Sequence, residues 1–254
     1  MHLPGARFCV QHPHLSVPAL GHREPPVDFI FMLTSHDRTV ADAEDVIEAA
    51  CDLGVTHIGF KDVGVPTAVM QALVRRIRAR GAVAYLEVVS TTPEAVLRSL
   101  EVARDLEIGR VLGGTDLDAA ERILGDLSGY YPFPGRPLGH PTRLEGSAEL
   151  VAGHCGAARA RGCGGVDLLA YRATEADPLD LVRAARAALQ GGRLIVAGSI
   201  GNNRQIDALG QAGVDAFTIG SAVFERTFSP ANGSLRGQIE DILAACADVP
   251  ARSA

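Results

Sequence analysis

The sequence predicts an α/β protein, a single (β/α)8 TIM barrel with an N-terminal extension. From Asp28 onward, short apolar runs rich in β-forming residues alternate with longer helical runs, which indicates parallel strands joined by crossover helices. Eight such strand-helix units fit into about 225 residues, as in a barrel. An open doubly wound sheet is the alternative. It is weaker because the first strand is not followed by a Gly-x-Gly-x-x-Gly turn.

Eight segments are apolar, short and bounded by turn residues, as buried parallel strands are. The expected strands are Phe29–Thr34, Thr56–Asp62, Val83–Ser90, Ile108–Gly114, Tyr130–Phe133, Val166–Arg172, Arg193–Ser199 and Asp215–Ser221.

The segments between these strands have the length and the amphipathic spacing of helices. The expected helices are Val40–Leu53, Thr67–Arg80, Pro93–Leu106, Asp116–Leu127, Ser147–Arg161, Pro178–Leu189, Asn203–Gln211 and Leu235–Ala247.

A Gly-Val pair precedes three of the strands, beginning at Gly54, Gly165 and Gly213. We interpret each glycine as the residue that closes a helix, where a positive φ is common. Seven residues after these glycines lie Lys61, Arg172 and Gly220, respectively. The repeat therefore predicts equivalent positions for them at the carboxyl ends of strands two, six and eight, the face on which barrel enzymes carry their active sites.

Composition excludes several classes of protein. The chain has 254 residues, of which 47% are hydrophobic and 21% charged, so it can bury a core. No apolar run is long enough to span a bilayer, and no signal peptide is evident, so we expect a cytoplasmic protein without a membrane partner. A net charge of -6 without a basic stripe argues against nucleic-acid binding. Five cysteines without a Cys-x-x-Cys pair indicate reduced thiols.

The first 27 residues do not fit the repeat, and we expect the domain to divide into an N-terminal arm, 1–27, and a barrel, 28–254. Within the arm, His12-Pro13-His14 invites a metal-site interpretation, because two imidazoles on a strand can bind one ion. No further ligand follows at suitable spacing, so a solvated turn is the better account. We therefore predict neither a metal site nor a cofactor.

Two loops near the C-terminus are rich in small residues. Gly198 and Ser199 follow the seventh strand, and Gly220 and Ser221 follow the eighth, before a short extra helix that begins near Val223. Small residues let backbone N–H groups approach an anion, and the loops after strands seven and eight are the usual phosphate cradle of such barrels. Glycines that merely serve tight turns remain the alternative.

The stretch from Ile195 to Phe224, with Ala-Gly-Ser-Ile, Ala-Gly-Val-Asp-Ala and Ile-Gly-Ser-Ala, resembles the ribulose-phosphate-binding barrels. The likeness is greatest to the phosphoribosyl isomerase and cyclase barrels of histidine biosynthesis, and it covers the last quarter of the chain. It implies a phosphosugar-type ligand held by Gly198, Ser199, Gly220 and Ser221. The catalytic aspartates of those enzymes, at the ends of strands one and five, have no counterpart here, so their reaction is not carried over.

Lys61 is the only lysine among 24 lysine and arginine residues. An ammonium group can lose its proton when it is desolvated and then serve as a base or an imine-forming nucleophile, whereas a guanidinium stays charged. The place of Lys61 at a strand end therefore indicates a catalytic role.

Glu87 interrupts the apolar run of strand three, next to the strand of Lys61. A carboxylate in such a strand is costly unless it is paired or functional, so we predict that Glu87 faces Lys61. The pair serves either as acid-base machinery or as a purely structural ion pair.

Other candidates have less support. Arg172 is expected to bind an anionic group of the substrate, with a rim ion pair as the alternative. Arg136 and His140 lie in a Pro- and Gly-rich loop, 134–143, which is typical of a lid or ligand loop. His36 is either a general acid or a residue of a helix-capping turn. We interpret Asp167 as a structural residue near the strand start, level with Asp215.

These residues predict an enzyme acting on a small phosphorylated metabolite, such as a sugar phosphate. The leading hypothesis is a metal-independent isomerase or epimerase in which Lys61 and Glu87 transfer protons next to a carbonyl. One alternative is a Schiff-base (class I) aldolase or decarboxylase that uses Lys61. Another is a non-catalytic phosphate-metabolite-binding barrel. A homo-oligomer is left open.

Overall fold

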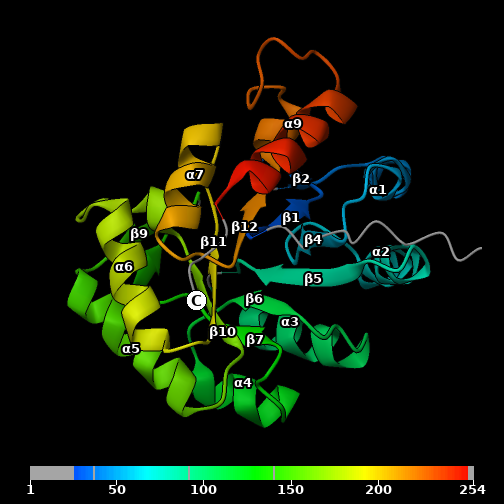
Figure 1. Ribbon diagram of the computed structural model, residues 1–254. Coiled ribbons are helices and arrows are strands. Elements are labelled where there is room, and N and C mark those ends of the chain that lie inside the picture. Colours follow the sequence, from blue (N-terminus) through cyan, green and yellow to red (C-terminus); the bar gives the residue numbers. More distant parts are fainter. Residues whose placement is uncertain (1–25, 37, 91, 140, 251–254) are drawn as a thin grey trace, which may run out of the picture.

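The chain folds into a barrel of parallel strands surrounded by helices (Figure 1). The structure, a computed structural model, describes residues 26–250 except 37, 91 and 140. Within that part, the eight strands of the main sheet are β1 (Asp28–Met32), β4 (His57–Lys61), β5 (Val83–Val88), β6 (Val111–Gly113), β7 (Tyr130–Tyr131), β10 (Gly165–Leu168), β11 (Arg193–Val196) and β12 (Ala216–Ile219).

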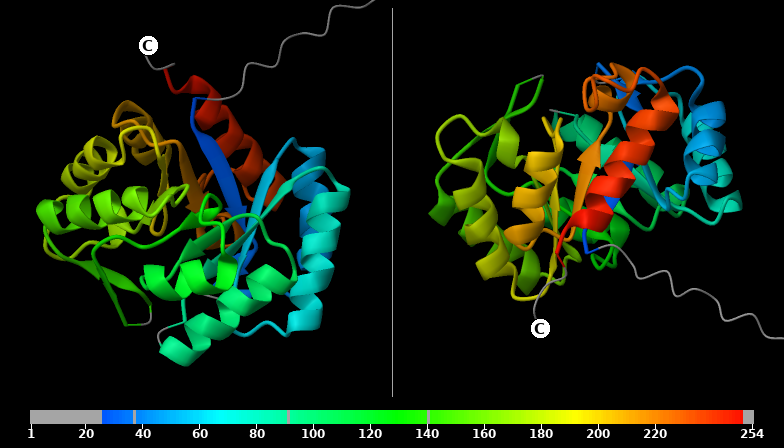
Figure 2. Two further views of the ribbon diagram at one scale, coloured as in Figure 1. Left: turned by 90° about the horizontal axis from the view of Figure 1, so that it is seen from below. Right: turned by 45° about the horizontal axis from the view of Figure 1, so that its top comes forward.

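The strands pair in the order β10-β11-β12-β1-β4-β5-β6-β7, and all of these pairings are parallel. Backbone hydrogen bonds also join the two strands at the ends of this order, β10 and β7, through residues in or directly beside them. The N–H of Gly164 donates to the Tyr130 carbonyl at 3.2 Å, and the N–H of Asp167 donates to the Pro132 carbonyl at 3.0 Å. The sheet is therefore nearly closed, and the predicted (β/α)8 barrel is confirmed (Figure 2).

Helices follow the strands and cover the outside of the barrel. They are α1 (Ala43–Asp52), α2 (Thr67–Ala79), α3 (Pro93–Asp105), α4 (Leu117–Leu124), α5 (Ala148–Ala160), α6 (Pro178–Leu189), α7 (Asn203–Gln211), α8 (Ser221–Phe224) and α9 (Leu235–Asp248). Side-chain oxygens cap the N-termini of six of them, from Thr92, Asp116, Ser147, Asp177, Asn202 and Ser234. Among the described residues, no helix is both long and apolar enough to cross a bilayer.

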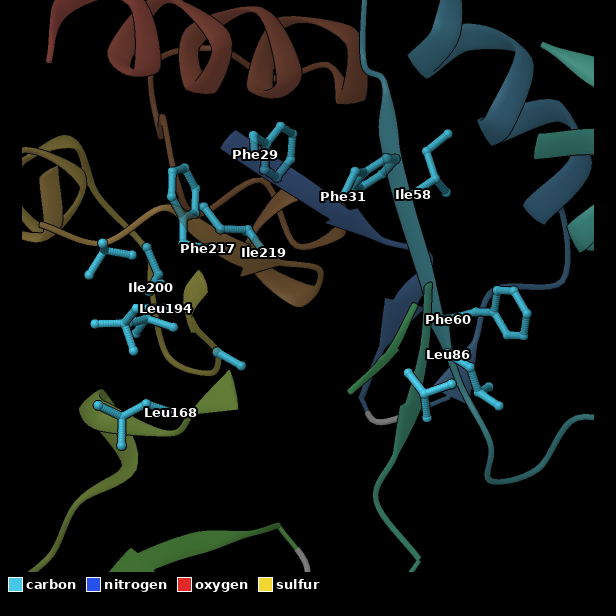
Figure 3. Packing of buried hydrophobic residues seen from close by; sticks show 14 of the residues in the cluster. Phe29, Phe31, Ile58, Phe60, Leu86, Leu168, Leu194, Ile200, Phe217 and Ile219 are labelled. Carbon is cyan, nitrogen blue, oxygen red and sulfur yellow. The ribbon is translucent and has the colours of Figure 1, made fainter. Parts of the chain in front are cut away.

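Alternate residues of the strands face opposite sides of the barrel wall, and two separate apolar clusters result. Outward residues such as Phe29, Phe60 and Phe217 pack against the helices (Figure 3). The inward cluster is smaller and comprises Ile30, Met32, Tyr85, Leu112, Tyr131, Ile195 and Ala216. This apolar cluster separates polar inward residues at the lower end, where Asp28 pairs with Arg193 and His57, from those at the carboxyl end, Lys61 and Glu87.

Two short hairpins lie at the carboxyl face of the barrel. One is formed by β2 (Thr34–Ser35) and β3 (Arg38–Thr39). The other is formed by β8 (Arg136–Leu138) and β9 (Arg143–Glu145), so the loop predicted at 134–143 is largely an antiparallel hairpin. The predicted N-terminal arm lies, up to residue 25, outside the described residues and stays a prediction.

The expected positions of the helices and strands are confirmed, with shorter strands than expected. One prediction of register was wrong. Gly54 and Gly213 close their helices with φ of 94° and 83°, but Gly162, with φ of 77°, does so before β10. Gly165 is instead the first residue of β10, and a Cβ there would lie 1.8 Å from the Arg193 carbonyl oxygen.

Counted from Gly162, the residue level with Lys61 and Gly220 is Leu169. Arg172 lies further along, in the 3-10 turn η1 (Ala170–Arg172) rather than at the end of a strand. The same shift by three residues changes the level within the barrel that is assigned to Asp167.

Candidate active site

A cavity of about 310 Å³ opens at the carboxyl face of the barrel. Its wall combines residues from β4, β5 and η1 with the loops that follow β11 and β12. Seven of the residues singled out from the sequence line it, namely Lys61, Glu87, Arg172, Gly198, Ser199, Gly220 and Ser221. The structure thus brings the predicted proton-transfer pair and the predicted phosphate loops into one hollow, of a size that suits a small metabolite.

Lys61 and Glu87 are ladder partners at the ends of neighbouring parallel strands, β4 and β5. Lys61 Nζ lies 4.0 Å from Glu87 Oε2, and the side chains are only 10% and 7% exposed. Both point inward because they alternate with Phe60 and Leu86, which belong to the outer cluster. The pair is therefore buried, and its open side faces the cavity.

Asp62, the next residue after Lys61, points the other way and holds the top of β5 in place. Its carboxylate accepts hydrogen bonds from the Val89 N–H at 2.9 Å, the Ser90 hydroxyl at 2.6 Å and the Ser99 hydroxyl at 2.7 Å. These bonds tie the end of β4 to the end of β5 and to α3. Asp62 thus fixes the height at which Lys61 and Glu87 meet.

The loop after β11 adopts a left-handed backbone at two successive residues, with φ of 80° at Gly198 and 59° at Ser199. The φ of 80° favours glycine at the first position, and a Cβ on Gly198 would in addition lie 2.4 Å from Arg172 Nε, so that Arg172 would have to move. A positive φ at Ser199 is uncommon for a residue with a side chain, and such strain concentrates at functional sites.

The loop after β12 leads directly into the four-residue helix α8 (Ser221–Phe224), close to the extra helix expected from the sequence. Gly220 lies against the barrel wall, since a Cβ there would be 2.6 Å from the Thr34 carbonyl oxygen. The N–H groups of the first turn of a helix have no acceptor within the helix. Those of α8 begin at Ser221, which lines the cavity.

Arg172 forms part of the cavity wall and lies between the loop after β11 and the β8–β9 hairpin. Its Nη1 donates to the Thr142 carbonyl at 3.2 Å, while Nε is buried and has no hydrogen-bond partner within the described residues. Arg172 and Ser199 also line a second cavity, of about 580 Å³, at the tip of the hairpin. The two hollows therefore adjoin at Arg172.

Asp167 is a site residue that sequence reasoning missed. It is inward-facing and fully buried, at 0% exposure, and its interactions with Glu87, Lys61 and Arg172 place it next to the pair. The prediction that it is a structural residue level with Asp215 was wrong about its position. Counted from Gly162, Asp167 is level with Thr218 and Gly59, which lie on the inner face. If Gly162 instead of Gly165 is taken as the glycine that closes the helix, the sequence places Asp167 on the inner face of the barrel.

Burial raises the pKa of the Asp167 carboxyl well above its usual range, and the neighbouring Glu87 raises it further. Lys61 and Arg172 oppose this effect but do not outweigh it. Neither carboxyl oxygen of Asp167 has a hydrogen-bond partner within the described residues. Thr34, which lines the cavity, likewise has a buried hydroxyl without a partner there.

Three other candidates do not join this cluster. The Arg136 guanidinium is half exposed and lies 3.5 Å from Glu175 Oε2, away from the cavity. His36 is 81% exposed and lies at the rim, where its ring is 3.6 Å from Glu225 and its backbone N–H donates to Ser221 Oγ at 3.3 Å. His140 lies outside the described residues. No group of three or more histidine, cysteine, aspartate or glutamate residues in the described part of the chain is arranged to hold a metal ion.

Solved structures with the same fold were found by comparison of the coordinates. Thiamine phosphate pyrophosphorylase from Pyrococcus furiosus is 16% identical with a TM-score of 0.55, over 87% of this chain and 96% of that one. Orotidine 5'-phosphate decarboxylase from Pyrococcus horikoshii is 14% identical with a TM-score of 0.59, over 87% and 100%. (S)-3-O-geranylgeranylglyceryl phosphate synthase from Thermoplasma acidophilum, in complex with sn-glycerol-1-phosphate, is 15% identical with a TM-score of 0.58, over 89% and 95%.

The chain shares the (β/α)8 barrel fold of these enzymes. The resemblance seen in its last quarter is thereby confirmed at the level of the fold. No protein-family model matches the sequence, and a search of curated proteins finds no match. At identities this low, the similarity concerns the architecture alone, so the chemistry has to be argued from the side chains.

Proposed function

We propose that this protein is an enzyme that acts on a small phosphorylated metabolite and transfers a proton at a carbon next to a carbonyl. A single observation carries the proposal: the buried Lys61–Glu87 pair and the glycine-rich loops after β11 and β12 line the same cavity. The phosphate compounds for which two of the compared proteins are named, orotidine 5'-phosphate and sn-glycerol-1-phosphate, also support a phosphorylated ligand.

The phosphate group would lie against Gly198, Ser199, Gly220 and Ser221, where backbone N–H groups gather and Arg172 adds a positive charge. Glu225 lines the same cavity but is exposed to solvent, so its charge is screened. The carbon skeleton of the ligand would then extend toward Lys61 and Glu87 on the opposite wall.

In the proposed reaction, one member of the pair removes a proton from a carbon next to the carbonyl, and the other supplies a proton to the carbonyl oxygen. Return of a proton to the former carbonyl carbon, with loss of the proton of the hydroxyl on the first carbon, gives an isomer. Return of a proton to the other face of the first carbon, with loss of the proton from the carbonyl oxygen, gives an epimer. No electrons are gained or lost overall. A positioned acid or base typically contributes a factor of about 10²–10⁴ in rate.

A second candidate uses Lys61 as a nucleophile. As the only lysine of the chain, with an Nζ that lines the cavity, it is placed to form an imine with a carbonyl substrate. Water would leave as the imine forms, and a carbon–carbon bond of the substrate would break next, as in an aldolase or decarboxylase. The compared structures include a decarboxylase and a synthase, which is compatible with this lyase chemistry.

Ligand binding is tested first with a thermal-shift screen of sugar phosphates against the same sugars without phosphate. A ligand at about 100 times its dissociation constant stabilises the folded state by about 2.7 kcal/mol. We expect phosphorylated compounds alone to raise the melting temperature. Equal shifts with the unphosphorylated sugars, or no shift with any compound, would contradict the proposal.

Borohydride trapping separates the two reaction types. The protein is incubated with each stabilising carbonyl compound and sodium borohydride, then digested and mapped by mass spectrometry. A reduced adduct on Lys61 supports the imine route. Catalytic turnover without any adduct supports proton transfer by the pair.

The third possibility raised by the sequence is a barrel that binds a phosphorylated metabolite without catalysis. It requires that Lys61→Arg binds the stabilising compound with unchanged affinity and that the wild-type protein never converts it. Both can be measured on the same samples.

A further inference from the structure

Asp167 is the most deeply buried ionisable group next to the cavity. It is 0% exposed, and it lies on β10 between Val166 and Leu168, which both face outward. Neither of its carboxyl oxygens has a hydrogen-bond partner among the described residues. An ionised carboxylate in such a place would lack the hydrogen bonds that normally offset its loss of hydration.

The charged neighbours of Asp167 come from three elements. Glu87 on β5, Lys61 on β4 and Arg172 on η1 interact with it electrostatically. Lys61 also lies opposite Glu87 at 4.0 Å, and Arg172 also donates to the Thr142 carbonyl. The two buried carboxyl groups, Asp167 and Glu87, therefore repel each other when both are ionised, and both cations have other partners. When two such carboxyl groups interact in a buried place, one of them keeps its proton.

We propose that Asp167 and Glu87 together hold one proton at neutral pH and that this proton resides on Asp167. The cluster of Lys61, Glu87 and Asp167 then carries no net charge, and Lys61 faces one carboxylate instead of two. As a positioning residue, Asp167 thus sets how much negative charge Lys61 faces in the barrel. That role rests on the proposed function, whereas the protonation of Asp167 does not.

Isotope-edited infrared spectroscopy tests the protonation without a ligand or an activity assay. Aspartates in water are ionised at pH 7. The wild-type protein with [4-¹³C]aspartate should therefore show one shifted carbonyl band of a protonated carboxyl, which Asp167→Asn lacks. Absence of that band in the wild-type protein at pH 7 would overturn the proposal, even if the variant failed to fold.

Stability against pH supplies a second test. The unfolded chain loses the proton of Asp167 above about pH 4, while the folded protein retains it. Folding of the wild-type protein therefore takes up about one proton between pH 4 and the raised pKa, and the stability due to this residue falls as the pH rises. Asp167→Asn should remove this uptake. An unchanged uptake would contradict the proposal.

Asp215→Asn is the matched control. Asp215 accepts hydrogen bonds from Arg186 Nη1 and from the Leu194 N–H, both at 2.7 Å, so its carboxylate has partners that Asp167 lacks within the described residues. We expect this variant to lose stability at neutral pH and to retain the proton uptake of Asp167.

The positioning role is tested on Lys61 itself, which gives a single side-chain signal in protein labelled with [6-¹³C]lysine. In a titration from about pH 6 to 11, the ionisation of Asp167 should add an inflection to the Lys61 shift. Asp167→Asn should remove it, whereas Glu225→Gln, at the exposed rim, should keep it. A Lys61 curve that is the same in the wild-type protein and in Asp167→Asn would contradict the role. Neither this result nor the infrared band depends on which substrate the protein uses.

Discussion

Lys61 Nζ lies 4.0 Å from Glu87 Oε2 because the two residues are ladder partners on adjacent parallel strands. Sheet register, rather than chain proximity, thus creates the pair. Asp62 secures that register with three hydrogen bonds to the top of β5 and to α3. The charges of Lys61 and Glu87 should therefore be energetically coupled.

Lys61→Met, Glu87→Gln and the double variant form a double-mutant cycle. Removal of one partner leaves the other charge buried, so each single variant should be destabilised by more than half of the loss in the double variant. We expect a coupling free energy of about 0.5–3 kcal/mol, measured by urea unfolding. Additive losses would show that the two charges do not interact.

Gly198→Ala should be strongly destabilising. The new Cβ would meet Arg172 Nε at 2.4 Å, and alanine is strained at a φ of 80°. The expected cost is about 2 kcal/mol in the free energy of unfolding. Gly201→Ala is the control within the same loop, since nothing lies within 4 Å of its Cβ position and its φ is not positive. Similar losses in both variants would refute the steric account.

Arg172→Ala should weaken the binding of a phosphorylated ligand. Loss of a hydrogen bond to a charged group costs about 1.5–3 kcal/mol, or roughly 10–150-fold in affinity. Arg183→Ala is a suitable control, because Arg183 is exposed on α6 and pairs only with Asp180 among the described residues. Titration calorimetry with the compound found by thermal shift measures both. Equal affinities of the two variants would place the phosphate elsewhere.

Cys155 and Cys246 should resist alkylation in the folded protein. Burial raises the pKa of each thiol to about 12, so the reactive thiolate is scarce at pH 8. In the folded protein, the alkylation rate should therefore increase with pH until the pH reaches this raised pKa. At pH 8, alkylation should be fast only after unfolding. Mass spectrometry after a pulse of iodoacetamide reports each site. Rapid labelling of either residue at pH 8 would contradict the packing described for α5 and α9.

The sequence was sufficient for the architecture because strand and helix patterns alternate regularly from Asp28 onward. It also brought Lys61, Glu87 and the two glycine-rich loops to one face, since residues at the carboxyl ends of parallel strands meet there. Placement of Asp167 failed for a local reason. Two glycines, Gly162 and Gly165, both fit a helix end, and only backbone geometry shows which of them adopts a positive φ.

The hairpin that carries Arg136 shows a second limit. Its Pro- and Gly-rich sequence predicted a loop near the ligand, but antiparallel pairing between β8 and β9 and the contact with Glu175 hold Arg136 away from the cavity. The hairpin itself is local, but the contact of Arg136 with Glu175, 39 residues further along the chain, is not evident from a single sequence.

In the proposed reaction, Lys61 and Glu87 transfer a proton at a carbon of the bound phosphate ester. Hydrogen–deuterium exchange at that carbon can be followed by proton NMR in D2O, on a keto-sugar phosphate that raises the melting temperature. We expect the wild-type protein to exchange a carbon-bound proton next to the carbonyl, and Glu87→Gln and Lys61→Met to do so about 10²–10⁴ times more slowly. Exchange by the wild-type protein that is no faster than in buffer would contradict the proposed reaction. Exchange in the two variants that is as fast as in the wild-type protein would contradict it as well.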